Sequence, residues 1–313
     1  MRARKTSEGE SMKVFVDGSA GTTGLEIVNR LKERGDISLV ILDEDKRKDP
    51  AYRKEAMLSS DLAVLCLPDD AAVEAVSFAE GSKVKIIDAS TAHRTSPSFV
   101  YGLPELPHRR EMIKSALRVA NPGCHASGFI ALVAPLVKAG VLDKNAPISA
   151  FSLTGYTGGG KKMIAEYEEG GAALAAPRQY ALGQMHKHLP EMVAETGLVH
   201  APAFLPVVGA FPRGMQVSVP LPAQWLTCGA EGIKEVYRDL YTGGVIRYEE
   251  AEGATLPADL MAGKDGMIVS LVGNKERLVA IASFDNLGKG ASGAAIQNMN
   301  LMLGAEETTG LNL

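Results

Sequence analysis

The sequence predicts an α/β protein in which a doubly wound parallel sheet is followed by a second, α+β part. Over the first hundred residues, short apolar runs alternate with longer helical patterns, and a glycine-rich turn follows the first run. After about residue 120, several strand patterns follow one another without a helix between them. The alternation is typical of parallel strands with right-handed helical crossovers, whereas directly consecutive strands favour antiparallel pairing.

The first part contains four predicted strands separated by three predicted helices. The strand patterns are short, apolar and rich in branched residues, as buried parallel strands are. We expect Leu25, Val28 and Leu31 to form the buried face of the first helix. The predicted strands cover residues 13–17, 38–42, 62–67 and 85–88, and the predicted helices cover residues 22–34, 51–59 and 69–80.

The second part has more strands than helices. We expect an apolar helix at its start and one long helix between its strands, and several neighbouring strands should pair antiparallel. A last, amphipathic helix over residues 291–303 is expected to pack back on the first part. The predicted strands cover residues 148–154, 203–209, 215–221, 267–272 and 278–283, and the other helices cover residues 127–139 and 229–241.

Composition excludes several classes of function. The 313 residues have a formal net charge of −4, only 5% are aromatic, and the basic run at residues 46–48 is short, which argues against nucleic-acid binding. No apolar run is long enough for a membrane helix, and the polar N-terminus lacks the apolar core of a signal peptide. The three cysteines (Cys66, Cys124, Cys228) are odd in number and far apart, which favours a reducing, cytoplasmic setting over a disulfide scaffold.

The glycine-rich turn is a candidate dinucleotide site. Its G-x-x-G-x-x-G spacing permits a tight turn and a close approach of backbone to phosphate, and the helix that follows offers free N–H groups and a positive dipole end. A purely structural strand-to-helix turn is the alternative. The predicted cofactor-binding residues are Gly18, Ser19, Ala20, Gly21, Thr22, Thr23 and Gly24.

Two charge runs bear on which dinucleotide is bound. The acidic residues 43–45 suit a ribose 2′-hydroxyl, whereas the basic residues 46–48 suit a 2′-phosphate. Either run is also consistent with a solvated loop. We favour NADPH, partly on the resemblance described below.

Cys124 is the candidate nucleophile. It lies between a strand-like segment, residues 117–120, and the apolar helix, directly after Pro122 and Gly123. A helix N-terminus stabilises a thiolate, and its free N–H groups can also stabilise an oxyanion. An inert buried cysteine is the alternative, and we assign that role to Cys66 and Cys228.

A second constellation, residues 186–191, supplies candidate bases. In an extended segment His186 and His188 would project to one side, and Pro190 would suit the first turn of a following helix. A neutral imidazole near a thiol is a common means of forming a thiolate. A metal site formed by His186, His188 and Glu191 is a rival interpretation, as are two surface histidines; we expect no metal. The other histidines are interpreted as structural or exposed.

From residue 12 onward the chain resembles the N-acetyl-gamma-glutamyl-phosphate reductase family in its shorter form. The resemblance rests on VDGSAGTTG (16–24), IDASTAHR (87–94), YGLPEL (101–106), NPGCHASG (121–128), GYTGGGKK (155–162), HKHLPE (186–191) and DNLGKGASGAAIQNMN (285–300). The NPGC and H-x-H-x-P-E elements, in this order, are specific, whereas the glycine loop is not. Longer relatives carry a D-x-S-x-D-F-R-like stretch where this chain has DASTAHR, and Ser90 and Arg94 keep their places.

The resemblance implies a Rossmann-like NADP domain and an α+β catalytic domain, as in aspartate-semialdehyde and glyceraldehyde phosphate dehydrogenases. It implies a homodimer or homotetramer that reduces N-acetyl-glutamyl 5-phosphate, a small molecule, with NADPH through a cysteine thioester. We expect an extension at residues 1–11, a dinucleotide-binding domain at 12–120 plus 286–313, and a catalytic and dimerisation domain at 121–285. By the resemblance, Cys124 is the nucleophile, His186 its base, and Ser90 and Asn286 cofactor contacts; Arg94, Asn121, His188 and Glu191 face the substrate. The motif does not decide between His186 and His188 as the base, and we favour His186.

Three alternatives stay open at this point. A sister enzyme such as aspartate-semialdehyde dehydrogenase would keep Cys124 and change only the acyl pocket. A non-catalytic nucleotide-sensing protein would keep the glycine loop without a reactive thiol. A metal hydrolase would use His186 and His188 as ligands.

Overall fold

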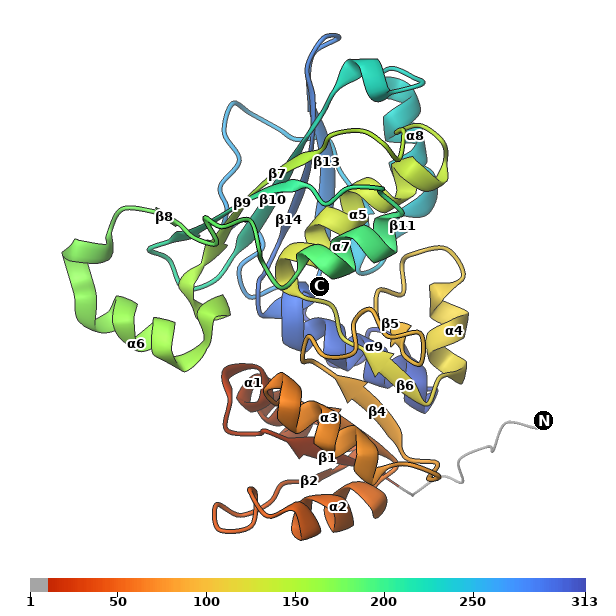
Figure 1. The fold of residues 1–313 in the computed structure, drawn as a ribbon, viewed down its shortest axis with the longest axis vertical. Coiled ribbons are helices and arrows are strands. Elements are labelled where there is room, and N and C mark those ends of the chain that lie inside the picture. Colours follow the sequence, from red (N-terminus) through yellow and green to blue (C-terminus); the bar gives the residue numbers. More distant parts are fainter. Residues whose placement is uncertain (1–10) are drawn as a thin grey trace.

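The computed structural model describes residues 11–313, and the predicted extension at residues 1–11 lies outside them except for its last residue. Within this range the chain forms two sheets, which lie one above the other in Figure 1. The chain passes from the first sheet to the second through α5 (Cys124–Lys138) and returns through α9 (Gly293–Leu303). The predicted order, a parallel sheet followed by an α+β part, is confirmed.

The first sheet is wholly parallel, with strand order β2-β1-β3-β4-β6-β5. All four predicted strands are present with small shifts at their ends, as is the strand-like segment before Cys124. The two-residue strand β5 was not predicted, because so short an element leaves no periodic pattern. The strands are β1 (Met12–Asp17), β2 (Ile37–Val40), β3 (Leu62–Leu65), β4 (Lys85–Asp88), β5 (Val100–Tyr101) and β6 (Arg118–Ala120).

The helices of the first sheet follow its strands. The predicted buried face of α1 is wrong in one residue, since Leu25 is 47% exposed. The helix buries Gly24, Ile27, Val28 and Leu31 instead, the i, i+3, i+4, i+7 stripe that starts one residue earlier. These helices are α1 (Thr22–Lys32), α2 (Pro50–Leu58), α3 (Asp69–Phe78) and α4 (Arg109–Ser115).

The second sheet is mixed, with strand order β11-β12-β13-β14-β10-β7-β9-β8. Its centre pairs antiparallel as predicted, but β7 and β9 are parallel neighbours, because the long segment between them makes a crossover. Its strands are β7 (Ser149–Gly155), β8 (Arg178–Gln179), β9 (Ala203–Gly209), β10 (Met215–Leu221), β11 (Thr242–Gly243), β12 (Ile246–Tyr248), β13 (Met267–Gly273) and β14 (Leu278–Phe284).

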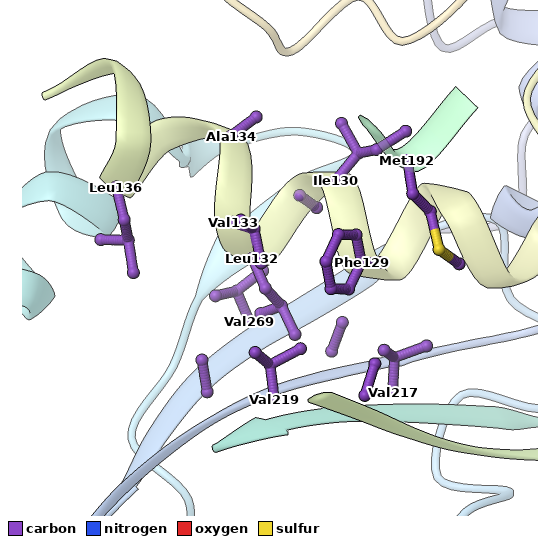
Figure 2. Close-up of a cluster of buried hydrophobic side chains, with 14 of the residues drawn as sticks. Phe129, Ile130, Leu132, Val133, Ala134, Leu136, Met192, Val217, Val219 and Val269 are labelled. Atoms are coloured by element: carbon purple, nitrogen blue, oxygen red, sulfur yellow. The ribbon is translucent and has the colours of Figure 1, made fainter. Parts of the chain in front are cut away.

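One face of the second sheet carries α5 together with α7 (Leu189–Thr196) and α8 (Ala230–Leu240). Figure 2 shows the contact: Phe129 and Leu132 of α5 point at Val217 and Val219 of the sheet. Helix α5 begins at Cys124, three residues before the predicted start, so the cysteine is its first residue. This packed core fixes the position of that residue.

Segment 156–174 forms an arm that the sequence did not predict as a helix. It contains α6 (Gly160–Gly170), flanked by the 3-10 turns Tyr156–Gly159 and Gly171–Leu174; a third such turn is Ala223–Trp225. The arm stands beside α1 at the left of Figure 1. Three consecutive glycines at its start masked the helical pattern of the residues that follow.

Helix α9 packs back on the first sheet as predicted, but the predicted amphipathicity is wrong. Preceded by a π-helical turn, Gly288–Ser292, it is buried on all sides against α4, β3 and β4. Its polar residues suggested an exposed face, yet they hydrogen-bond inside: Asn298 donates to the Gly102 carbonyl at 2.9 Å, and Asn300 donates to the Thr309 carbonyl at 2.9 Å. Among residues 11–313, no helix combines the length and apolarity that crossing a bilayer requires.

Candidate active site

A cavity of about 680 Å³ lies where the glycine loop, the turn before α5 and the segment after β8 meet. Its walls come from chain segments that are far apart in sequence. Its lining residues include Thr22, Cys124, Lys161, His186, Lys187 and Asn286.

The glycine loop leads into this cavity from β1. Gly18 has a φ of 82°, and a Cβ there would collide with the Cys66 carbonyl, while a Cβ at Gly24 would collide with Gly18. Helix α1 starts without a side-chain cap, and the Thr22 hydroxyl oxygen is buried without a partner in the described part of the chain. Free N–H groups and an unpartnered hydroxyl at a helix N-terminus fit a phosphate group. The loop therefore fits a dinucleotide pyrophosphate.

The same loop borders a second cavity of about 330 Å³ on the β2 side. Residues 18–21 line the second cavity and residues 21–24 line the first, so each of the seven predicted cofactor residues lines at least one. Arg47 and Lys48 also line the second cavity, whereas the acidic residues 43–45 do not. Of the two charge runs, the basic one therefore reaches the loop.

Cys124 stands at the start of α5, in the wall of the main cavity. Its N-cap, Gly123, must be glycine, because a Cβ there would lie 2.5 Å from His188 Nε2 and 2.6 Å from Glu191 Oε1. Burial raises the pKa of the Cys124 thiol to about 11, opposed by the His125 backbone N–H and by the positive charges of Arg94 and Lys187. The resting thiol is therefore protonated and needs a base or a bound ligand to ionise.

Glu191 is 1% exposed and binds the turn that precedes Cys124. Its Oε2 accepts hydrogen bonds from the Tyr101 hydroxyl at 2.6 Å and the Gly123 N–H at 3.1 Å. Its Oε1 accepts from Arg94 Nη1 at 2.7 Å. Glu191 is not among the residues that line the main cavity. It therefore acts on the site through Gly123 and Arg94.

His186 and His188 lie together, with ring centroids 4.6 Å apart, but not because the segment is extended. The chain turns here, and the His188 N–H donates to His186 Nδ1 at 3.1 Å. Pro190 lies in the first turn of α7, as predicted. Burial lowers the pKa of His186 to about 4, and it lowers the pKa of His188 well below its usual range. Both imidazoles are therefore neutral near pH 7.

His125 also lines the main cavity, although we expected it to be structural or exposed. Its Nδ1 lies 2.7 Å from the Ser152 hydroxyl, and its Nε2 lies 2.5 Å from the Tyr180 hydroxyl. Burial lowers the pKa of His125 to about 3. Its ring centroid is 5.3 Å from that of His186. Its position next to Cys124 in the sequence was the available signal.

The remaining predicted site residues divide between the cavity and its support. Asn121 lines the cavity and donates to the Ala291 carbonyl at 3.0 Å. Asn286 lines it too and donates to the Thr157 hydroxyl at 2.9 Å. Ser90 lines neither cavity, and its hydroxyl donates to Asp88 at 2.8 Å. Cys66, which we interpreted as an ordinary buried cysteine, borders both cavities.

Within residues 11–313 there is no group of three or more histidine, cysteine or acidic side chains arranged to hold a metal ion. His188 Nε2 lies 4.0 Å from Glu191 Oε1, but that carboxylate is committed to Arg94, Tyr101 and Gly123. The Cys124 thiol thus shares one cavity with the neutral imidazoles of His186 and His188 and with the glycine loop, which fits a phosphate group. Such a site can form and break a covalent bond to an acyl group.

Two family profiles match the chain. Residues 13–116 match the profile described as "Semialdehyde dehydrogenase, NAD binding domain", and residues 124–286 match "Semialdehyde dehydrogenase, dimerisation domain". Three proteins named N-acetyl-gamma-glutamyl-phosphate reductase, two of them with the suffix 2, are similar over nearly their whole length. The Pseudomonas putida protein is 44% identical (95% of this chain, 98% of that protein), the Nostoc protein 45% (96% and 99%) and the Brucella anthropi protein 46% (93% and 98%).

Solved structures of aspartate semialdehyde dehydrogenases have the same fold at low sequence identity. The Vibrio cholerae enzyme II superposes with a TM-score of 0.71 at 16% identity, covering 94% of this chain and 99% of that one. The Candida albicans enzyme, solved with NADP, gives 0.66 at 14% identity, covering 95% and 99%. The predicted combination of a Rossmann-like sheet and an α+β part is thereby confirmed.

Proposed function

This chain belongs to the N-acetyl-gamma-glutamyl-phosphate reductase family, and from that membership we propose that it reduces N-acetyl-L-glutamyl 5-phosphate to N-acetyl-L-glutamate 5-semialdehyde and phosphate with NADPH, a step of arginine biosynthesis. The observation that carries the proposal is the position of Cys124, at a helix N-terminus in the cavity into which the glycine loop opens. A nucleophilic thiol and a hydride donor must share one space for this reaction.

The cofactor would be held by residues 18–24, with its pyrophosphate at the N-terminus of α1. Arg47 and Lys48 support NADPH over NADH, because they place positive charge in the cavity beyond the loop, where a 2′-phosphate would lie. Bound NADPH would supply the hydride that reduces the Cys124 thioester. Asn286 would position the nicotinamide end, since it lines the main cavity from the opposite side. Ser90 supports this region only indirectly, through Asp88.

Cys124 would attack the acyl carbon of the substrate. A C–S bond forms, the C–O bond to the phosphate breaks, and phosphate leaves with the electron pair of that bond. The N–H groups at the start of α5 would stabilise the oxyanion. After reduction, the C–S bond of the thiohemiacetal breaks and Cys124 recovers its thiol. The neutral His186 would accept the thiol proton and later return it.

The other predicted substrate contacts take different parts in this proposal. Asn121 and His188 line the cavity and would touch the substrate directly. Arg94 also lines the cavity and would offer the leaving phosphate its free N–H groups. Glu191 would act as a positioning residue, because it binds the Gly123 N–H rather than the cavity.

We further propose a cytoplasmic homodimer or homotetramer with the domain division 12–120 plus 286–313 and 121–285. The match to a dimerisation domain and the face of the second sheet opposite α5 support the oligomer. On that face Phe151 is 41% exposed, and Leu153, Leu205, Val207 and Ile281 are half-buried. An apolar sheet face of this kind favours burial against another copy.

The test is a steady-state assay in the oxidative direction, with N-acetylglutamate semialdehyde, NADP and phosphate. We expect turnover that depends on all three. Aspartate semialdehyde is the comparison substrate, because the neighbouring folds are aspartate semialdehyde dehydrogenases. A preference for aspartate semialdehyde would assign the chain to the sister activity, and no turnover of either would leave a nucleotide-sensing role.

A further inference from the structure

The charged side chains that line the main cavity are all positive: Arg94, Lys161 and Lys187. No aspartate or glutamate is among the lining residues of this cavity in the described chain. A cavity with cations and no carboxylate concentrates anions. Both proposed ligands, NADPH and the acyl phosphate, carry several negative charges. Each of the three cations can therefore bind a different anionic group.

Arg94 is the least available of the three. Its Nε donates to the Asn121 carbonyl at 3.0 Å, its Nη2 to the Ala89 carbonyl at 3.0 Å and its Nη1 to Glu191 at 2.7 Å. The side chains of this ion pair are 9% and 1% exposed. Glu191 therefore offsets the charge of Arg94 before any ligand arrives.

The two lysines have no such partner. Among residues 11–313, neither Lys161 nor Lys187 forms an ion pair or a side-chain hydrogen bond, and both are exposed at the cavity mouth. Lys162, the neighbour of Lys161, is exposed but does not line the cavity. Two ammonium groups without an ion pair in the described chain thus line the space between the glycine loop and Cys124. The carboxylate of Asp69 lies outside the lining: the Lys187 charge helps to lower its pKa, but the two groups form no ion pair.

The two lysines belong to different segments of the cavity wall. Lys161 follows Gly160, where a Cβ would lie 3.9 Å from the Thr22 hydroxyl, so Lys161 belongs to the cofactor side. Lys187 stands between His186 and His188. Its charge opposes the rise that burial causes in the pKa of Cys124, and it helps to lower the pKa of His186. Lys187 is therefore the cation on the side of the reacting thiol that forms no ion pair within the described residues.

We propose that Lys187 binds the phosphoryl group of the acyl phosphate and follows the phosphate as it leaves. The proposal rests on the reaction proposed above and deepens it. When Cys124 forms its bond to the acyl carbon, the departing oxygen takes the electron pair of the C–O bond, and the ammonium group offsets the charge that develops there. A flexible lysine suits a leaving group that moves, whereas Arg94 is fixed by its three contacts.

The first experiment compares Lys187→Met, Lys161→Met and Lys162→Met by steady-state kinetics in the oxidative direction. For Lys187→Met we expect the KM for inorganic phosphate to rise about 10- to 100-fold, as the loss of one charge-assisted contact implies. Its KM values for the semialdehyde and NADP should stay within about 2-fold of the wild-type values, which is the size of change expected of a surface substitution that removes no contact to the ligand. Lys161→Met should raise the KM for NADP and leave the KM for phosphate unchanged. Lys162→Met should change neither of these two KM values. Lys187→Arg, which keeps the positive charge, should have the wild-type KM for phosphate.

An unchanged phosphate KM in Lys187→Met would overturn the proposal. A higher KM for the semialdehyde alone would also overturn it, because that result assigns Lys187 to the substrate carboxylate.

A second experiment does not depend on the identity of the acyl substrate. Iodoacetamide should alkylate Cys124, and inorganic phosphate in the cavity should slow this reaction in the wild type. Lys187→Met should need about 10-fold more phosphate or above for half protection, while Lys162→Met should need the wild-type amount. If the wild type turns over no semialdehyde, the proposed function fails, yet this experiment still decides on Lys187. Equal protection in wild type and Lys187→Met, or none in either, would contradict the proposal.

Discussion

Gly290 lies directly against Cys124: a Cβ atom on the glycine would stand 2.9 Å from the Cβ of the cysteine and 3.1 Å from the Asp285 carbonyl oxygen. Gly290 belongs to the π-helical turn that leads into α9. A segment far from Cys124 in the sequence therefore packs directly against this cysteine. The position of the thiol thus depends on a contact that only glycine permits.

Gly290→Ala should therefore impair the enzyme more than its fold. The added methyl group must displace Cys124 or the π-helical turn, and overpacking of this kind costs about 1–3 kcal/mol. We expect a fall in kcat well beyond that of Gly35→Ala, which meets no atom within 4 Å. Urea unfolding and the oxidative assay measure the two effects, and equal kcat values in both variants would disprove the contact's importance.

Cys124→Ser should abolish turnover, by more than about 10³-fold, because a serine hydroxyl is a far weaker nucleophile in this wall. Cofactor binding should persist, since residues 18–24 are untouched. NADP titration by fluorescence and the oxidative assay separate the two properties. Cys228→Ser is the matched control, as Cys228 lies outside the main cavity and should leave turnover unchanged. Near-normal turnover in Cys124→Ser would exclude the thioester route.

His186→Ala should lower kcat about 10²- to 10⁴-fold, as the loss of an acid–base group does. Because burial lowers the pKa of His186 to about 4, the acid limb of the wild-type rate profile should lie below the usual histidine range of about 6.5. The variant should lose that limb. The same profile measured on His188→Ala is the control, and loss of the limb there alone would assign the role to His188.

Glu191→Gln should destabilise the protein by about 3–5 kcal/mol, because it leaves the buried Arg94 guanidinium without its carboxylate. Chemical denaturation measures the change. Glu111→Gln breaks the exposed pair with Lys114 and should cost less than about 1 kcal/mol. If the two variants lost similar amounts of unfolding free energy, the buried ion pair between Glu191 and Arg94 would stabilise the protein no more than an exposed pair does.

Stability should fall as the pH drops from about 6.5 toward 4. Burial lowers the pKa of His125 to about 3. Between that value and about 6.5, the histidine is protonated in the unfolded chain but stays neutral in the folded protein. The sign is therefore a loss of unfolding free energy with falling pH, at up to about 1.4 kcal/mol per pH unit for one such group. Urea unfolding at several pH values should show a shallower slope for His125→Asn. The exposed His200→Asn should keep the wild-type slope, and a wild-type slope in His125→Asn would refute the prediction.

Local patterns were enough to predict most elements of the fold. The strands β9 and β10 and the glycine loop follow from apolar runs and turn residues, which act on their own neighbourhood. The interior burial of α9 could not be predicted, because its asparagines are satisfied only by residues such as Gly102 from a distant segment. The helix α6 was hidden by the glycines before it.

The candidate site shows the same limit. Cys124, His186 and the glycine loop could be found from motifs, since each carries its own chemistry. The commitment of Glu191 to Gly123, the freedom of Lys187 and the place of His125 in the wall depend on how separate segments meet. Residue type alone does not reveal whether a charge is already paired.

Helix α9 also bears on the order in which this chain can fold as it is made. Its Ile296 and Met299 fill the same core as Val14 and Val64 of the first sheet, but the ribosome adds them only after every strand of the second sheet. Until then, the first sheet emerges with part of its apolar surface uncovered. That surface therefore stays open to contact with other molecules until α9 is made, and exposed apolar surface of this kind promotes aggregation.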